Sequence, residues 1–187
     1  TSNGNKVAKF TVSSSSVIAG YGNNGYYTGG ASTSAVSDIS VAYDSTANRS
    51  IIAFSDGNNS SYGTATVANF SGGGVPTFGT PVVFNAAATG YVQIADDPVN
   101  GVTLIAYKDS GDGDDGTVLT ATVSGTSLTY GSEVEFDPDV AFPWDLIRDP
   151  DGGKFVVAYL DEIGGSGGNY DGSLITITMT SGVPNLA

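Results

Sequence analysis

The sequence contains no histidine and no cysteine among its 187 residues. Their absence excludes Ser-His and Cys-His catalysis, thiol redox chemistry, disulfide frameworks and the common zinc sites. Only six residues are lysine or arginine, against nineteen aspartates and glutamates, so the formal net charge is −13. Such a surface repels phosphate groups, and we therefore expect no nucleic-acid partner. We also expect no membrane insertion, because no apolar run approaches the roughly 20 residues that a spanning helix requires.

The residues that are abundant indicate a folded chain. Hydrophobic residues make up 40% of it, and its 27 glycines do not follow the three-residue period of collagen. This length is typical of one large domain or of an array of small repeats. The chain begins at Thr1 with no methionine and no signal-like apolar segment, which indicates a processed or partial chain.

An internal repeat is the main feature of the sequence. The motif reads IIAFSD at residues 51–56, LIAYKD at 104–109 and VVAYLD at 156–161, at intervals of 53 and then 52 residues. Ten residues before the aromatic residue of each motif, an aspartate precedes a turn-forming stretch rich in proline, asparagine or glycine. These aspartates are Asp44, Asp97 and Asp149. Each stretch is a strong hairpin signal.

Two further strand patterns complete the repeat unit. An alternating run follows each motif, as in GTATVA at residues 63–68, and an aromatic-Gly segment follows at 77–84 and again at 129–136. We expect the inner strand, such as residues 51–54, to be buried on both faces and the alternating strand to lie nearer solvent. Four strands in about 50 residues favour a β-propeller blade.

The predicted fold is therefore all-β, a β-propeller-type repeat built from four-stranded antiparallel blades. Residues 1–30 form a partial blade, its third and fourth strands, plus a Gly/Asn-rich connection. Repeat 1 covers residues 31–80, repeat 2 covers 81–132, and repeat 3 covers 133–187 without its fourth strand. About 3.5 blades are too few for a ring, since known propellers have roughly four or more. Further chain or oligomerisation must then complete the ring.

The best copy of the repeat, residues 41–84, resembles the repeats of marine tailed-phage (cyanophage-like) tail-fibre and other virion structural proteins. The similarity rests on Ala-Tyr-Asp, an inner strand ending aromatic-x-Asp, Tyr-Gly-Thr-Ala and Thr-Phe-Gly-x-Pro-Val-Val-Phe. It covers loosely residues 36–178. It implies propeller-blade architecture and a place in a virion, but it supplies no catalytic residues.

Candidate binding residues gather in the loops after the inner strands. Loops vary on one face of a repeat scaffold, and Asn, Asp and Tyr suit hydroxyl-rich glycans. The candidates are Asp56, Asn58, Asn59, Tyr62, Asp109, Asp112, Asp161, Asn169 and Tyr170. The alternative, which we favour for Asp56, Asp109 and Asp161, is that these aspartates only cap turns.

Trp144, the only tryptophan, is a further candidate, for stacking on a sugar. We favour its burial between adjacent blades, because aromatic residues in strands usually belong to the core.

We expect no cofactor, and calcium is the one metal alternative. Asp112, Asp114 and Asp115 are closely spaced oxygen donors, but they do not follow the EF-hand pattern. The favoured interpretation is a solvated acidic loop.

An enzyme would have to rely on carboxylates, as glycosidases do. Adjacent acidic residues such as Asp161 and Glu162 are usually surface charge, so we expect no enzymatic activity.

The functional hypothesis is a non-enzymatic virion structural protein of a tailed phage: a tail fibre, an appendage or a capsid-surface decoration. Its expected partners are other copies of itself, other virion proteins and host-surface glycan, on an extracellular particle. The alternative is a secreted or cell-surface glycan-binding β-propeller lectin.

Overall fold

The structure is a computed structural model that describes residues 6–12, 18–26, 36–70, 76–163 and 168–187. It confirms the all-β prediction: apart from a three-residue 3-10 turn, η1 (Gly57–Asn59), every regular element in these ranges is a strand. Accordingly, the described residues include no helix that is long and apolar enough to cross a membrane.

The strands follow one another with short connections. They are β1 (Lys6–Val12), β2 (Ile18–Tyr26), β3 (Val36–Asp44), β4 (Arg49–Asp56), β5 (Tyr62–Asn69), β6 (Thr77–Phe78), β7 (Val82–Asp97), β8 (Val102–Asp109), β9 (Asp115–Ser124), β10 (Ser127–Tyr130), β11 (Val134–Asp149), β12 (Lys154–Glu162), β13 (Tyr170–Thr180) and β14 (Val183–Leu186).

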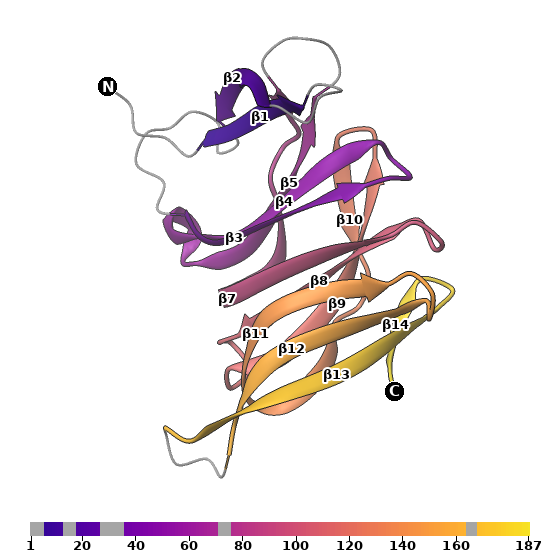
Figure 1. The fold of residues 1–187 in the computed structure, drawn as a ribbon. Helices are drawn as coiled ribbons and strands as arrows, with labels where there is room; N and C mark the ends of the chain where they lie inside the picture. Colours follow the sequence, from indigo (N-terminus) through magenta and orange to yellow (C-terminus); the bar gives the residue numbers. More distant parts are fainter. Residues whose placement is uncertain (1–5, 13–17, 27–35, 71–75, 164–167) are drawn as a thin grey trace.

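Twelve of the strands form one antiparallel sheet (Figure 1). Its order is β14-β13-β12-β11-β9-β8-β7-β5-β4-β3, with β6 also paired to β5 and β10 to β9. Strands β3 and β14 end this path, so the described strands do not close into a ring. Strands β1 and β2 form a separate two-stranded sheet, where the sequence predicted the third and fourth strands of a partial blade. The connection after Tyr26 lies outside the described residues.

Two long strands divide the sheet into three four-stranded units. The first half of β7 pairs with β5 and its second half with β8, and β11 is shared in the same way between β9 and β12. We call residues 36–88 the first unit, 89–140 the second unit and 141–186 the third unit. The last strand of one unit thus continues directly into the first strand of the next.

The third unit does have a fourth strand, which corrects the sequence prediction. Strand β14 pairs with β13 from Ile177↔Leu186 to Thr180↔Val183, as β10 pairs with β9. Its residues lack the aromatic-Gly pattern, but backbone pairing does not require that pattern.

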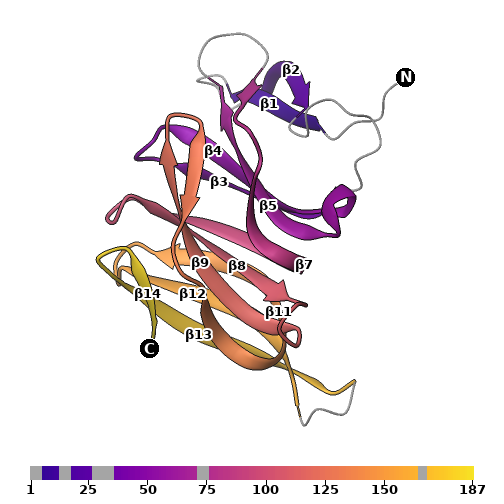
Figure 2. The ribbon, with the colours of Figure 1, turned by 180° about the vertical axis from the view of Figure 1, so that it is seen from behind.

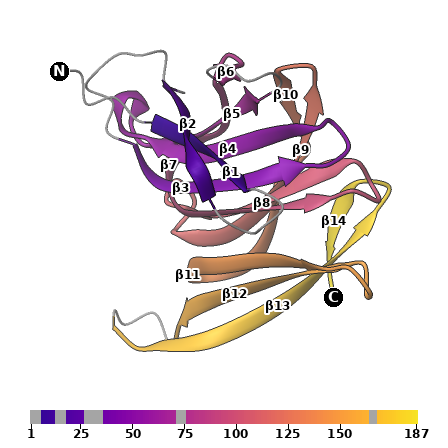
Figure 3. The same ribbon diagram turned by 45° about the horizontal axis from the view of Figure 1, so that its top comes forward.

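The three units stack face to face, with an apolar core in each interface. Ile51 and Val67 of the first unit pack with Ile105 and Tyr107 of the second. On the opposite face of the second unit, a separate core joins it to the third: Leu104, Ala106, Val118, Phe155, Val157 and Ile177. Figure 3 shows β11, β12 and β13 as a layer distinct from β7 and β8. The hairpin that follows β9 projects toward the first unit (Figure 2), where β10 contacts β5.

Stacking also decides which strands are buried. The inner strands β4 and β8 are buried on both faces, as predicted for β4, but β12 is not: residues 156–159 were also expected to be buried on both faces, and Val156, Ala158 and Tyr159 are only half-buried. The prediction that the alternating strands lie nearer solvent is wrong for β5 and β9, whose residues are buried on both faces, Thr66 and Thr120 included. In the third unit, Leu174 is 72% exposed, although Val118, its equivalent in the second unit, is completely buried.

The repeated aspartates cap the first turn of each unit, where the sequence predicted hairpins. Oδ1 of Asp44 accepts the N–H of Ala47 at 2.8 Å, and Oδ1 of Asp149 accepts the N–H of Asp151 at 3.0 Å. Asp97 caps its turn through the N–H of Val99 at 3.1 Å.

The first turns also connect neighbouring units. Nε of Arg148 in the third unit donates to Oδ1 of Asp97 in the second, at 3.1 Å. One unit earlier, the Ser45 hydroxyl donates to Oδ2 of Asp96 at 2.8 Å. Asp96 and Arg148 both lie directly before a turn aspartate, so this repeat position reaches back to the preceding unit.

Candidate functional site

The first strand of each unit is interrupted by a bulge at the same repeat position. The pairing register shifts between Ser37 and Ser40 in β3, between Gly90 and Gln93 in β7, and between Pro143 and Asp145 in β11. Asp38, Tyr91 and Trp144, one residue from each bulge, are separated by 53 residues each. A bulge leaves a residue outside the strand pairing and redirects its side chain.

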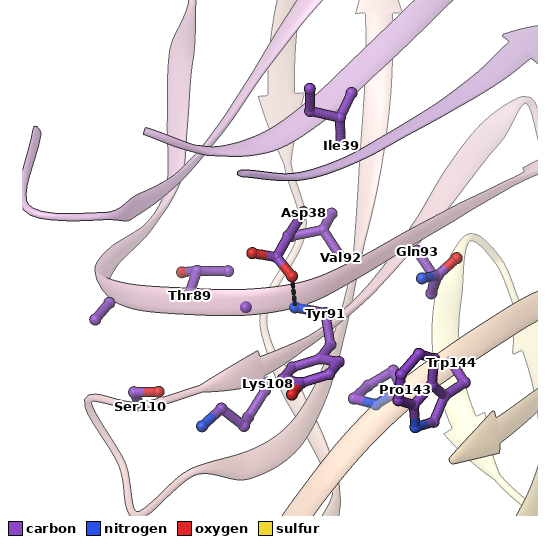
Figure 4. Close-up of a pocket in the computed structure, with 12 residues that line it drawn as sticks. Asp38, Ile39, Thr89, Tyr91, Val92, Gln93, Lys108, Ser110, Pro143 and Trp144 are labelled. Carbon is purple, nitrogen blue, oxygen red and sulfur yellow. Dashed lines mark hydrogen bonds between the residues drawn. The ribbon is translucent and has the colours of Figure 1, made fainter. Parts of the chain in front are cut away.

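Two of these residues have unusual backbone conformations. The φ angles of Asp38 and Tyr91 are 50° and 54°, in the left-handed region that residues other than glycine seldom occupy. Oδ1 of Asp38 accepts the backbone N–H of Tyr91 at 2.9 Å, which joins the bulge of the first unit to that of the second (Figure 4). Strained backbone of this kind is concentrated at functional sites.

A cleft of about 580 Å³ lies over the bulges. Its lining comes from all three units: Asp38, Ile39, Ala88, Thr89, Gly90, Tyr91, Val92, Gln93, Lys108, Ser110, Pro143 and Trp144. Figure 4 shows the rings of Tyr91 and Trp144 near the ammonium-bearing chain of Lys108 and the amide of Gln93. The cleft therefore combines aromatic surfaces with hydrogen-bonding groups of both kinds.

The aromatic residues form a row that extends out of the cleft. The ring of Tyr91 lies edge-on to Trp144 at 5.6 Å and to Phe142 at 4.9 Å, and Phe142 contacts Tyr170 at 5.3 Å. Nζ of Lys108 lies 5.2 Å from the centre of the Phe142 ring, within the range of a cation–π contact. Each contact restrains the next, so the rings are held in place before any ligand arrives.

Lys108 is fixed by an ion pair. Its Nζ lies 2.7 Å from Oδ1 of Asp114. Burial opposes ionisation of Asp114, but the hydrogen bonds from Lys108 and Ser110 outweigh it and hold the pKa of this carboxyl below its usual range. The cleft thus presents a positioned cation whose charge is already balanced, which suits a neutral polar ligand better than an anion.

Trp144 is the one sequence-predicted binding residue that lines the cleft, and its predicted burial is wrong. Its side chain is 59% exposed, because the bulge between Pro143 and Asp145 turns it away from the core. The gap between units that it was expected to fill is occupied by Leu146 and Phe155 instead.

The structure brings none of the other candidates into the cleft. Asp56 and Asp109 cap their loops, accepting the N–H of Asn58 at 3.1 Å and of Gly111 at 2.9 Å. Asn58 and Asn59 are exposed and Tyr62 is half-buried at the start of β5; Asp112 and Asn169 are exposed loop residues. Tyr170 does not line the cleft, and its ring contacts Phe142 at the end of the aromatic row.

The carboxylates of Asp161 and Glu162 do not face each other. They are consecutive residues of β12, so their side chains point to opposite faces of the sheet. Burial, and after it the nearby charges of Asp137 and Asp139, raises the pKa of Asp161. The two groups therefore do not form the facing pair that a glycosidase requires.

Sequence reasoning missed Asp38, Tyr91, Gln93 and Lys108. The signal that could have found the first two is the 53-residue interval that ends at Trp144. This interval is hard to recognise because the three positions hold different residue types, whereas a repeat is identified from the residues that its copies share.

The cleft can thus stack on an apolar face of a ligand through Tyr91 and Trp144 and form hydrogen bonds through Gln93 and Lys108. No protein-family model, curated protein or solved structure matches this chain.

Proposed function

We propose that this protein is a non-enzymatic virion structural protein of a tailed phage that binds host-surface glycan in the cleft over its bulges. The observation that best supports glycan binding is the exposed ring of Trp144 beside Tyr91, with Gln93 and Lys108 lining the same cleft. At about 580 Å³ the cleft is in the size range of small-molecule sites, about 300–1,000 Å³. A glycan end of one to three sugar rings is the expected occupant.

The virion assignment rests on the repeat resemblance. Its best copy, residues 41–84, includes the turn after β3, the inner strand β4, and strands β5 and β6. The formal net charge of −13 disfavours a nucleic-acid partner. Proteomic analysis of purified phage particles tests this assignment, and we expect the chain among the particle proteins. Its detection only in uninfected cells would contradict the assignment and favour the secreted or cell-surface lectin.

Binding is tested on a glycan array and by titration of the sugars that the array identifies. We expect Trp144→Ala to weaken binding at least tenfold, because the largest stacking surface is lost, while the melting temperature changes little. Tyr43→Ala is the matched control, since Tyr43 is an aromatic residue of β3 that is 55% exposed and outside the cleft. Unchanged binding by Trp144→Ala would refute the cleft as the glycan site.

The loop candidates provide the opposing test. Replacement of Asn58, Asn59 and Tyr62 together should leave binding intact if the cleft is the site, because none of them lines it. Lost binding in this variant with an unchanged melting temperature would place recognition in the loop after β4 instead.

We also propose that the three units are propeller-type blades and that a second copy of the chain covers the open face of the third unit. In the second unit, Leu104, Ala106 and Val118 are buried under the third unit. Their equivalents, Val156, Ala158 and Leu174, form an uncovered apolar surface. Light scattering after size exclusion should give a dimer or larger ring, and Leu174→Lys should give a monomer. A monomeric unmodified chain would refute this assembly.

A further inference from the structure

Three carboxylates converge where the second unit meets the third. One oxygen from each of Asp112, Asp115 and Glu135 lies within 4.8 Å of the others. Asp112 lies in the β8–β9 loop, Asp115 begins β9, and Glu135 lies on the first half of β11. The sequence had suggested Asp114 as the third group, but its carboxylate is bound to Lys108.

The described residues supply no partner for the carboxylate of Asp115. The residue is buried, at 6% exposure. Among the described residues, no hydrogen-bond donor and no cation contacts its carboxylate: the two ion pairs found there are Lys108–Asp114 and Arg148–Asp97. Its charged neighbours are all acidic.

This environment is unfavourable for an isolated carboxylate. The nearest carboxylates, those of Glu135 and Asp112, are negatively charged as well. Burial of an unpaired charge is costly, and protein structures avoid it unless a counter-charge or a metal is bound. Because Lys108 is paired with Asp114, none of the described residues supplies a counter-charge here.

We propose that Asp112, Asp115 and Glu135 bind one calcium ion. Calcium takes six to eight oxygen ligands in flexible geometry, and carboxylates are its usual protein ligands. Asp112 and Glu135 are exposed, so the remaining positions are open to water. Magnesium fits less well, since it requires a near-ideal octahedron and gives up its own water reluctantly.

The site has no counterpart in the first unit. The first unit carries Asn59, Tyr62 and Val83 at the equivalent positions, which offer no carboxylate. The β8–β9 loop already contacts the next unit, where the N–H of Ala141 donates to the carbonyl oxygen of Asp114 at 3.1 Å. A bound ion would therefore fix this loop against the bend of β11 at the joint between two units.

The test is calorimetric titration and thermal unfolding of the full chain, first stripped with EDTA and then given calcium chloride in 0.15 M salt. We expect one ion per chain and a higher melting temperature with calcium. Glu135→Val, which installs the first unit's residue, and Asp115→Asn should each weaken calcium binding at least tenfold. Asp115→Asn should also melt higher than the parent in EDTA, because it removes the buried charge.

Asp151→Asn is the matched control, since it removes one exposed acidic charge from a turn of the third unit. It should keep the full calcium response. The proposal is overturned if calcium leaves the parent's melting temperature unchanged, if Asp115→Asn and Glu135→Val respond as the parent does, or if magnesium acts equally well. These readouts involve no glycan, so they stand apart from the proposed binding function.

Discussion

Asp97 and Asp149 occupy the same position in consecutive units, yet their removal should have very different costs. Asp149 is exposed and its side chain accepts one backbone N–H. The side chain of Asp97 is 1% exposed, and it accepts bonds from the turn and from Arg148, whose side chain is 13% exposed. In Asp149→Ala only a turn cap is lost, whereas Asp97→Ala also leaves a guanidinium buried without a partner.

The two magnitudes follow from this difference. Loss of an exposed cap costs about 1 kcal/mol. Breaking a buried ion pair by removing one partner costs about 3–5 kcal/mol, since the remaining charge is uncompensated. Asp97→Ala should therefore lower the free energy of unfolding by roughly 2–4 kcal/mol more than Asp149→Ala. For a chain of this size, that difference corresponds to a melting temperature lower by roughly 4–16 °C.

Urea unfolding followed by circular dichroism measures both variants against the parent. Arg148→Met is the companion variant: it should cost less than Asp97→Ala, because Asp97 keeps its bonds within the turn. Equal losses for Asp97→Ala and Asp149→Ala would refute the argument that burial and the link between units, not the turn cap, determine the cost.

Two further predictions concern packing and pH. Gly116→Ala should destabilise the fold by about 1–3 kcal/mol, because the added Cβ would lie 2.5 Å from the Phe136 ring. Gly172 occupies the equivalent position with open space around it, so Gly172→Ala should be nearly neutral. Urea unfolding measures both variants. Because the folded-state pKa of Asp161 is raised above its usual value, its contribution to stability falls as the pH rises through that pKa. Asp161→Asn should therefore be more stable than the parent at pH 7, with an advantage that shrinks toward pH 4. An advantage independent of pH would contradict the argument that burial and the charge of Asp137 disfavour the ionised carboxylate.

The repeat sequence determined the strands and their turns. The apolar runs at residues 51–54, 104–107 and 156–159 lie in β4, β8 and β12, and Asp44, Asp97 and Asp149 cap the turns before them. These features depend on short stretches of chain: alternation and β-branched side chains favour extended backbone, and an aspartate bonds to an N–H two or three residues later. Local interactions of this kind can be recognised in each copy.

Tertiary structure alone decided how the units are joined, because those contacts connect residues about 50 positions apart. Nothing in the pattern around Trp144 shows that a bulge turns the ring outward, and its predicted burial failed for that reason. The convergence of Glu135 on Asp115 likewise depends on the bend of β11 over β9. The sequence specified the composition of each unit, whereas the cleft and the acidic cluster arise from stacking, where residues from different units share one surface.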